Sequence, residues 1–312
     1  MIGAILSGGY GKRLKPITDE IPKGLIQIKE NYSILDRQIF DFTTIGVREI
    51  YFLSGYLGEK IEERYGKGTD EVEFHYLRET KPMGTLYSVR NLISQRDDDD
   101  ILLRNGDTIT DMNFKRFVRF AQSSAYKMIM FTTKMRSPFG IVDVLGDQVT
   151  EFREKPLLDH YINAGVYYIK RDAFAFFNED YHEKDLETTA FPRIAANKGM
   201  GAYWEDTLWM GIDSEKDLDM IRKEYSNRVD YSWGYRKTVF KEGDKSIVDY
   251  YIKSDEKLSL ATHSNFTVRV LKGSGLIRTG NTSSYTSDDV IVGKGSVIIE
   301  ARTPTILQLI EL

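Results

Sequence analysis

Three glycines and two cationic residues lie close together near the start of the chain. The segment LSGGYGKRLKPITDEIPKG places Gly8, Gly9 and Gly11 ahead of Arg13 and Lys23. Glycines let backbone N–H groups approach an anion closely, and the two side chains supply the positive charge that phosphate groups attract. The segment therefore predicts a phosphate-binding loop. A glycine-rich turn with exposed cations is the alternative interpretation of these residues alone.

Two common phosphate-binding motifs are excluded by the spacing. The dinucleotide-binding pattern Gly-x-Gly-x-x-Gly fails because Leu14 stands where the third glycine is needed. A Walker loop needs serine or threonine after Gly-Lys, and here Arg13 follows Lys12. The loop belongs to neither class, and a GTP-binding switch of the Walker type is disfavoured.

Five regions of the chain, one of them made of two segments, resemble signature motifs of the sugar-phosphate nucleotidylyltransferase family and follow one another in the family's order. The loop is similar to the family pattern Leu-Ala-Gly-Gly-x-Gly-x-Arg-Leu-x-Pro-Leu-Thr followed by Pro-Lys. KPMGT, LLRNGDTITD and INAGVYYIK look like its Pro-Leu-Gly-Thr, Asn-Gly-Asp and Asn-Ala-Gly elements. FGIVDV and VTEFREKP, which ends at Pro156, resemble its Phe-Gly-Val and Glu-Lys-Pro elements. The resemblance covers the N-terminal two-thirds of the chain.

The resemblance implies an enzyme that joins a nucleoside triphosphate to a sugar 1-phosphate and releases pyrophosphate. An oxygen of the sugar phosphate attacks the α-phosphorus in line, so the protein mainly positions two polyanions and neutralises their charge. Such a reaction needs arginine, lysine and a divalent ion, and no covalent nucleophile.

The resemblance also assigns roles to individual residues. Arg13 would hold the β- and γ-phosphates, and Lys23 would bridge the α-phosphate and the incoming phosphate. On the sugar side, Glu154 would accept hydrogen bonds from hydroxyls and Lys155 would pair with the sugar phosphate. The nucleotide would contact Leu6, Gly8, Gly9, Gly11, Glu79, Gly84 and Thr85, and the sugar pocket would be lined by Gly140 and Asn163.

Two aspartates are expected to bind Mg²⁺, a hard ion that prefers carboxylate and phosphate oxygens. By resemblance, Asp107 after Asn-Gly is the first. Many family members carry the second in a Trp-x-Asp-x-Gly-Thr stretch, but LWMGIDSEKDL has Gly211 at that place and Asp213 two residues later. Cytidylyltransferases acting on glucose 1-phosphate show a similar shift. We therefore expect Asp213 to be the second ligand, the alternative being that it caps the following helix.

Glu79 occupies the position that often faces the base in this family. A carboxylate only accepts hydrogen bonds, and guanine offers adjacent N1–H and N2–H₂ donors, whereas uracil and thymine have an acceptor beside N3–H. Guanylyltransferases for mannose and heptose 1-phosphates also tend to have Glu here, so GTP and a sugar of this type are favoured. A solvent-facing Glu79, a cytidylyltransferase, and a non-catalytic subunit that binds nucleotide sugars are alternatives.

The elements that must position these residues alternate between strand and helix up to about residue 225. This alternation predicts an α/β domain at residues 1–228 with a mostly parallel sheet. The resemblance implies that the sheet is Rossmann-like, of the GT-A-like type. The β-rich runs are residues 2–6, 48–54, 71–76, 100–105 and 126–133, and the helical periods are residues 33–46, 58–66, 84–93 and 113–122.

The pattern changes after residue 228. Short β-type runs separated by turns predict a small all-β barrel at residues 229–312. The runs are residues 246–254, 266–273, 288–295, 296–301 and 305–312. This part resembles the cupin barrel of mannose-6-phosphate isomerase-type domains, but only His263 stays near a metal-ligand position. We expect a degenerate cupin without isomerase chemistry that supplies a homo-oligomer interface or a binding surface.

Composition narrows the classes of partner. The formal charge of −4 argues against generic nucleic-acid binding, which usually shows a basic domain. The chain contains no cysteine, which excludes disulfides and thiolate sites and fits a reducing cytosol. No secretory signal and no window of ~18 consecutive apolar residues is found. We expect a soluble cytoplasmic protein without a membrane partner.

Overall fold

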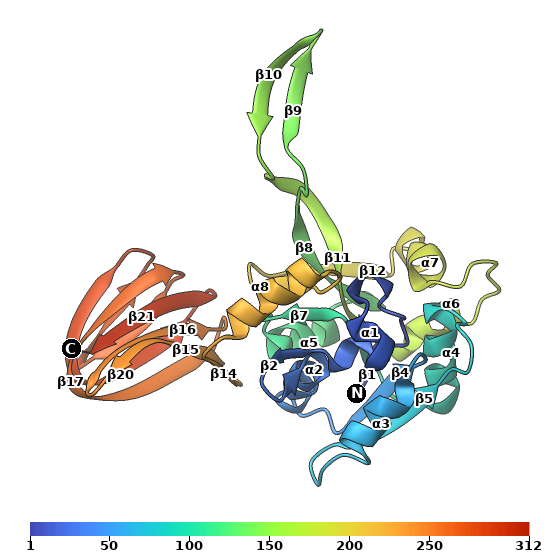
Figure 1. The fold of residues 1–312 in the computed structure, drawn as a ribbon, viewed down its shortest axis with the longest axis horizontal. Coiled ribbons are helices and arrows are strands. Elements are labelled where there is room, and N and C mark those ends of the chain that lie inside the picture. The colour runs from blue at the N-terminus through green and yellow to red at the C-terminus, as the bar shows by residue number, and fades with distance from the viewer. Residues whose placement is uncertain (312) are drawn as a thin grey trace.

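The structure, a computed structural model, describes residues 1–311, with the side chains of residues 263 and 264 left out. The earlier expectation for His263 therefore lies outside the described side chains. Two large sheets lie at opposite ends of the molecule, and a hairpin projects from the first of them (Figure 1).

The first sheet has seven strands, in the order β12-β8-β11-β6-β1-β4-β5. Neighbours run parallel except at β11, which is antiparallel to both β6 and β8. The mostly parallel α/β sheet predicted from the sequence is confirmed. The strands are β1 (Ile2–Ser7), β4 (Glu49–Ser54), β5 (Glu73–Arg78), β6 (Ile101–Asn105), β8 (Met128–Arg136), β11 (Leu157–Ile169) and β12 (Met200–Trp204).

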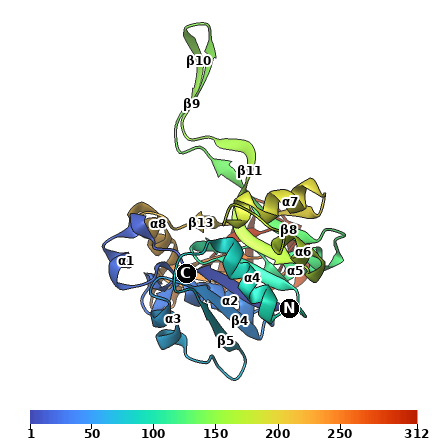
Figure 2. The ribbon, with the colours of Figure 1, turned by 90° about the vertical axis from the view of Figure 1, so that its right-hand side faces the viewer.

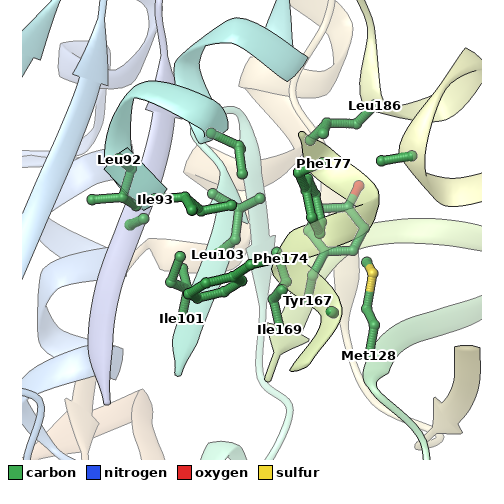
Figure 3. Close-up of a cluster of buried hydrophobic side chains, with 14 of the residues drawn as sticks. Leu92, Ile93, Ile101, Leu103, Met128, Tyr167, Ile169, Phe174, Phe177 and Leu186 are labelled. Atoms are coloured by element: carbon green, nitrogen blue, oxygen red, sulfur yellow. The ribbon is translucent and has the colours of Figure 1, made fainter. Parts of the chain in front are cut away.

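Helices cover both faces of this sheet. One core cluster contains apolar side chains of α4, α6 and α7, and the other contains those of α2, α3 and α5. Figure 3 shows part of the first cluster, where α4 and α6 pack onto β6 and β11. The helices are α1 (Ile17–Glu20), α2 (Ile34–Thr43), α3 (Gly58–Tyr65), α4 (Thr85–Gln95), α5 (Phe114–Ser123), α6 (Phe174–Phe177), α7 (Ala190–Ala196) and α8 (Glu215–Tyr225).

The second sheet is antiparallel, with the strand order β14-β15-β16-β21-β17-β20-β18-β19. It confirms an all-β region in the C-terminal part, while the cupin-like barrel and the division between residues 228 and 229 stay predictions. Its strands are β14 (Arg228–Tyr231), β15 (Gly234–Glu242), β16 (Lys245–Ile252), β17 (Lys257–Lys272), β18 (Gly275–Thr279), β19 (Asn281–Tyr285), β20 (Val290–Ala301) and β21 (Thr305–Glu311).

One expected turn of the second sheet is wrong. Residues 288–295 and 296–301 were expected to be two strands, but they form the single strand β20. Gly295, with a φ of +88°, lies inside the strand where the register with β17 shifts. A glycine in this conformation accommodates an irregularity of the ladder rather than ending the strand.

Three small sheets complete the fold. The pair β2 (Gln27–Lys29) and β3 (Tyr32–Ser33) precedes α2, and the hairpin β9 (Ile141–Leu145) and β10 (Gln148–Arg153) projects from the body. The pair β7 (Thr108–Thr110) and β13 (Trp209–Gly211) joins segments that are far apart in the chain. Among the helices of residues 1–311, none combines the length and the apolar character that a membrane crossing requires.

A buried ion-pair network joins the two large sheets. Arg37 of α2 contacts Asp111 at 3.3 Å and Asp230 of β14 at 3.1 Å. Arg228, also of β14, pairs with the same two carboxylates. All four side chains are at most 4% exposed. Because buried charges need partners, this network fixes the second sheet against the segment that follows β7.

Candidate active site

The glycine loop follows β1, at the carboxyl end of the first sheet. Gly11 has a φ of +59°, and a Cβ there would lie 2.8 Å from Cγ2 of Thr18, whose hydroxyl donates to the Gly11 carbonyl. A Cβ on Gly8 would lie 3.3 Å from the backbone nitrogen of Gly55. A Cβ on Gly9 would meet nothing within 4 Å. The loop itself therefore requires Gly11, whereas Gly9 exposes its backbone to open space that an anion can enter.

Four of the predicted residues come together beside this loop. The Nζ of Lys23 donates to Oδ2 of Asp107 at 2.8 Å and to Oδ1 of Asp213 at 2.7 Å. Arg13 lies 3.0 Å from the same oxygen of Asp213. The Lys23 side chain is only 14% exposed, whereas that of Arg13 is 75% exposed. The arrangement gives one largely enclosed and one exposed cation next to two carboxylates.

The charges of this cluster keep Asp213 ionised. Partial burial raises the pKa of Asp213, but the hydrogen bond and charge of Lys23 and the charge of Arg13 outweigh burial, so that its pKa lies below the ordinary value. Ser214, not Asp213, is the N-cap of α8, with its hydroxyl accepting from the Asp217 N–H at 3.3 Å. The helix-cap alternative for Asp213 is therefore wrong, and its carboxylate is free to serve the cluster.

The turn that carries Asp107 is held from two sides. The N–H of Gly106 donates to the carbonyl of Leu6 at 2.8 Å, and a Cβ on Gly106 would lie 2.5 Å from that oxygen. The buried amide of Gln38 donates to the carbonyls of Asn105 at 2.9 Å and Thr108 at 2.8 Å. Leu6, predicted to bind the nucleotide, thus uses its carbonyl to position the Asp107 turn.

A pocket of about 580 Å³ opens beside the glycine loop. The rings of Tyr10 and Tyr56 meet at its edge, with centroids 5.0 Å apart, and Glu59 pairs with Arg78 at 2.6 Å. Its lining residues are Gly8, Tyr10, Gly55, Tyr56, Leu57, Glu59, Arg78, Glu79, Thr80, Lys81 and Pro82. Aromatic rings and charged groups therefore line the same pocket.

Glu79 lines this pocket but also bonds within the chain. Its carboxylate accepts hydrogen bonds from the Met83 N–H at 3.0 Å and from the Ser88 hydroxyl. These bonds hold the segment that leads to Gly84. Glu79 is therefore not merely a solvent-facing side chain. Each of its two oxygens accepts a hydrogen bond within the chain and keeps a further lone pair that can accept another.

Gly84 and Thr85 lie at the start of α4, in contact with the segment from Lys184 to Leu186. Gly84 has a φ of +88°, and a Cβ there would lie 2.5 Å from the carbonyl oxygen of Lys184. The Thr85 hydroxyl accepts from the Leu186 N–H at 2.9 Å. The structure thus shows a packing reason for both residues, and their contact with a nucleotide stays a prediction.

The predicted sugar-side residues fall in two places. Asn163 of β11 donates to the Tyr167 hydroxyl at 2.7 Å, and its oxygen accepts from the Gly165 N–H at 2.9 Å. Because a Cβ on Gly165 would lie 2.9 Å from the amide of Asn105, Asn163 belongs to the surroundings of the Asp107 turn.

The other three sugar-side residues lie at the root of the projecting hairpin (Figures 1 and 2). Glu154 and Lys155 pair with each other at 3.3 Å, with side chains 61% and 53% exposed. A Cβ on Gly140 would lie 2.6 Å from the ring of Phe152 and 3.2 Å from the Glu154 carboxylate. Within the described residues, Glu154 and Lys155 form no ion pair with the Lys23 cluster, so their role at the sugar stays a prediction.

Sequence reasoning missed several residues of the pocket. Tyr10 lies inside the glycine loop, but the sequence pattern did not indicate a role for its ring. Tyr56, Glu59 and Arg78 follow or end the parallel strands β4 and β5, at the same edge of the sheet as the glycine loop. Their location at the carboxyl ends of predicted strands could have indicated them, because ligands of open α/β sheets bind beyond those ends.

This fold and this site define an α/β protein with a glycine loop after its first strand and a pair of carboxylates bridged by a lysine beside that loop. Residues 2–226 match the family model described as nucleotidyl transferase, and the chain belongs to that family. Among curated relatives, the mannose-1-phosphate guanyltransferase of Yarrowia lipolytica is 30% identical over 233 residues, and that of Kluyveromyces lactis is 29% identical over 229. Each match covers 70% of this chain, which spans 62% and 63% of those relatives.

Solved structures share the fold. A putative glucose-1-phosphate thymidylyltransferase from Bacillus anthracis superposes with a TM-score of 0.61 at 19% identity, over 72% of this chain and 94% of that one. HddC from Yersinia pseudotuberculosis gives a TM-score of 0.57 at 20% identity, over 72% of this chain and all of that one. At such identities the likeness shows the fold alone.

Proposed function

We propose that this chain is a sugar 1-phosphate nucleotidylyltransferase that uses GTP and a sugar 1-phosphate of the mannose or manno-heptose type. The observation that carries the proposal is the contact of Lys23 with both Asp107 and Asp213 beside the glycine loop. The names of the relatives, mannose-1-phosphate guanyltransferases, support the reaction and the base.

In the proposed reaction, an oxygen of the sugar phosphate forms a bond to the α-phosphorus of the triphosphate. The bond from that phosphorus to the oxygen that bridges it to the β-phosphorus breaks, and pyrophosphate leaves with the electron pair. Arg13, exposed and able to turn toward the β- and γ-phosphates, neutralises the leaving group. Lys23 exchanges a carboxylate for phosphate oxygens and holds the two reacting groups together.

Asp107 and Asp213 fit a divalent cation such as Mg²⁺. Both face one ammonium group in this structure, so the space between them favours positive charge. Hard cations prefer such carboxylate oxygens, and a bound ion would neutralise phosphate charge. Among the side chains that the structure describes, no group of three or more acidic or histidine residues is placed to surround an ion. Phosphate oxygens and water would therefore complete the shell.

The pocket beside the glycine loop would take the base. The Glu79 carboxylate can accept from guanine N1–H and N2–H₂, which favours GTP. A second candidate base is cytosine, because the displacement of Asp213 relative to Gly211 resembles that of cytidylyltransferases acting on glucose 1-phosphate. The bonds from Met83 and Ser88 also leave less of the Glu79 carboxylate for the two guanine donors. On the sugar side, Asn163 would line the pocket, and Glu154 and Lys155 would bind the sugar hydroxyls and phosphate.

Pyrophosphate release tests the proposal. The purified chain is mixed with Mg²⁺, each of GTP, CTP, UTP, dTTP and ATP, and a panel of sugar 1-phosphates. We expect release with GTP that requires both the metal and the sugar phosphate. Release with CTP and with no other nucleotide would show that the base is cytosine and not guanine, and it would leave the proposed reaction unchanged. Nucleotide-sugar binding by calorimetry without any release would refute the transferase and support a non-catalytic binding subunit.

A further inference from the structure

The hairpin of β9 and β10, residues 141–153, is an arm that extends away from the body of the molecule. Both views show it projecting beyond the helices and strands of the first sheet (Figures 1 and 2). Every residue from Val142 to Phe152 is exposed. A two-stranded hairpin on its own is at best marginally stable in water. The arm therefore needs another surface to pack against.

The arm has one apolar and one charged face. Val142 pairs across the strands with Phe152, and Val144 pairs with Val149, which places these four side chains on one face. Their side chains are 45–64% exposed.

The opposite face of the arm carries its charged groups, together with Ile141 and with Leu145, which is 74% exposed at the tip. Asp143 stands opposite Glu151, and Arg153 pairs with Asp143 at 2.9 Å and also with Glu151. One guanidinium is therefore paired with two carboxylates on the face that remains in water, and the apolar face carries no charge.

We propose that a second copy of this chain covers the apolar face, arm against arm, and that the arm is the dimerisation element of the protein. A row of three valines and a phenylalanine can face a second copy of itself, so two copies related by a two-fold axis bury it without burying a charge. The chain's own body does not cover the arm, because the arm points away from it.

The exposed area agrees with a second copy as the occupant. Phe139 and Leu157, 75% and 55% exposed, extend the apolar surface at the root of the arm. From the sizes of these side chains, the apolar face and its root offer about 600 Å² per copy, or about 1,200 Å² for two, which reaches the lower bound for a stable interface. A much larger partner surface is not needed to account for the exposed residues.

Sedimentation equilibrium on the full chain tests this inference. We expect the wild type to be a dimer at micromolar concentration and Val144→Asp to dissociate at least 100-fold more readily. Val144 is exposed, so the variant retains the fold, which circular dichroism verifies. The matched control is Val292→Asp, which changes a valine 70% exposed on β20 of the C-terminal sheet, and it should remain dimeric.

A thiol cross-link gives a second, independent measurement. Because the chain has no cysteine, Val144→Cys introduces a single thiol. We expect mild oxidation to give a disulfide-linked dimer with Val144→Cys and not with Glu151→Cys on the charged face. A monomeric wild type at tens of micromolar would overturn the proposal. A dimer that Val292→Asp breaks and Val144→Asp leaves intact would overturn it as well, and would place the interface on the C-terminal sheet.

Discussion

The backbone N–H of Ile212 donates to the carbonyl oxygen of Asp107 at 2.9 Å. This bond continues the β7–β13 ladder, in which Gly211 stands opposite Thr108. The register sets the residue after Ile212 beside the Asp107 turn, which explains how Asp213 reaches Lys23 although Gly211 occupies the usual aspartate position. The displaced aspartate is thus a consequence of strand pairing.

Asp213→Asn should abolish most of the proposed activity without unfolding the protein. The amide keeps the size of the side chain but loses the charge that would hold a divalent cation, so we expect kcat/KM to fall on the order of 100-fold and the Mg²⁺ requirement to rise. Pyrophosphate release measured against Mg²⁺ concentration checks this. Asp219→Asn, on the exposed side of α8, should behave as wild type. An unchanged Mg²⁺ profile in Asp213→Asn would remove it from the metal site.

Lys23→Ala should strongly lower kcat while the protein remains folded. Without the ammonium group, the carboxylates of Asp107 and Asp213 face each other unbridged, and the reacting phosphates lose their common partner. We expect kcat to fall by about 10²–10³-fold. Lys15→Ala is the matched control, because Lys15 lies in the same loop but pairs with the exposed Asp19. Equal losses in the two variants would mean that general positive charge, not the Lys23 position, matters.

Glu79→Gln should change the choice of base. The substitution replaces one acceptor by an amide donor, so guanine loses a partner while uracil gains one, and we expect the preference for GTP over UTP to fall about 10-fold or more. Initial rates with both nucleotides measure the ratio. Glu59→Gln makes the same change at the other carboxylate that lines the pocket and tests whether that residue recognises the base instead. If Glu59→Gln shifts the ratio and Glu79→Gln does not, Glu79 serves only its bonds to Met83 and Ser88.

The parts of the site that the sequence predicted are those encoded by local motifs. The glycine loop and the surrounding helices and strands follow from residue types and spacing within short windows, and the Asp107 turn was expected from the resemblance of one such window to a family motif. The Tyr56 and Arg78 contributions to the pocket depend on the order of parallel strands, which local spacing does not specify. The FGIVDV segment indicated a family motif, but it did not indicate that these residues form part of a projecting arm. The direction of the arm depends on how the strands β8 and β11 leave the sheet.

The ion-pair network was also beyond sequence reasoning, for a different reason. Single charged residues such as Arg37, Asp111 and Arg228 resemble surface residues in a sequence, because most charged side chains are exposed. Their burial results from the packing of β14 against α2 and against the segment after β7, which lie far apart in the chain. Another contact of β14, the hydrogen bond from Lys29 to the Arg228 carbonyl, joins residues 199 positions apart. Only the assembled fold shows them as partners.

Asp230 of this network should make stability depend on pH in the acid range. Burial raises the pKa of Asp230, but the charges of Arg37 and Arg228 and the hydrogen bond from Arg228 outweigh it, so that its pKa in the folded state lies below the ordinary value of 3.8. The folded state then binds fewer protons than the unfolded state. The stabilisation is therefore present above about pH 4 and is lost as the pH falls through the folded-state pKa.

Asp230→Asn should reduce this slope and lower stability at neutral pH. The variant leaves Arg37 and Arg228 buried with one partner fewer, so we expect a loss of about 3–5 kcal/mol at pH 7 and a flatter acid dependence of the urea midpoint. Asp98→Asn is the control, because Asp98 pairs with Arg96 while 69% exposed, where solvent screens the pair, and its midpoint should follow the wild-type curve. A wild-type slope retained in Asp230→Asn would show that other carboxylates govern acid unfolding. Activity lost together with stability would then indicate that the network also holds the Asp107 turn through α2.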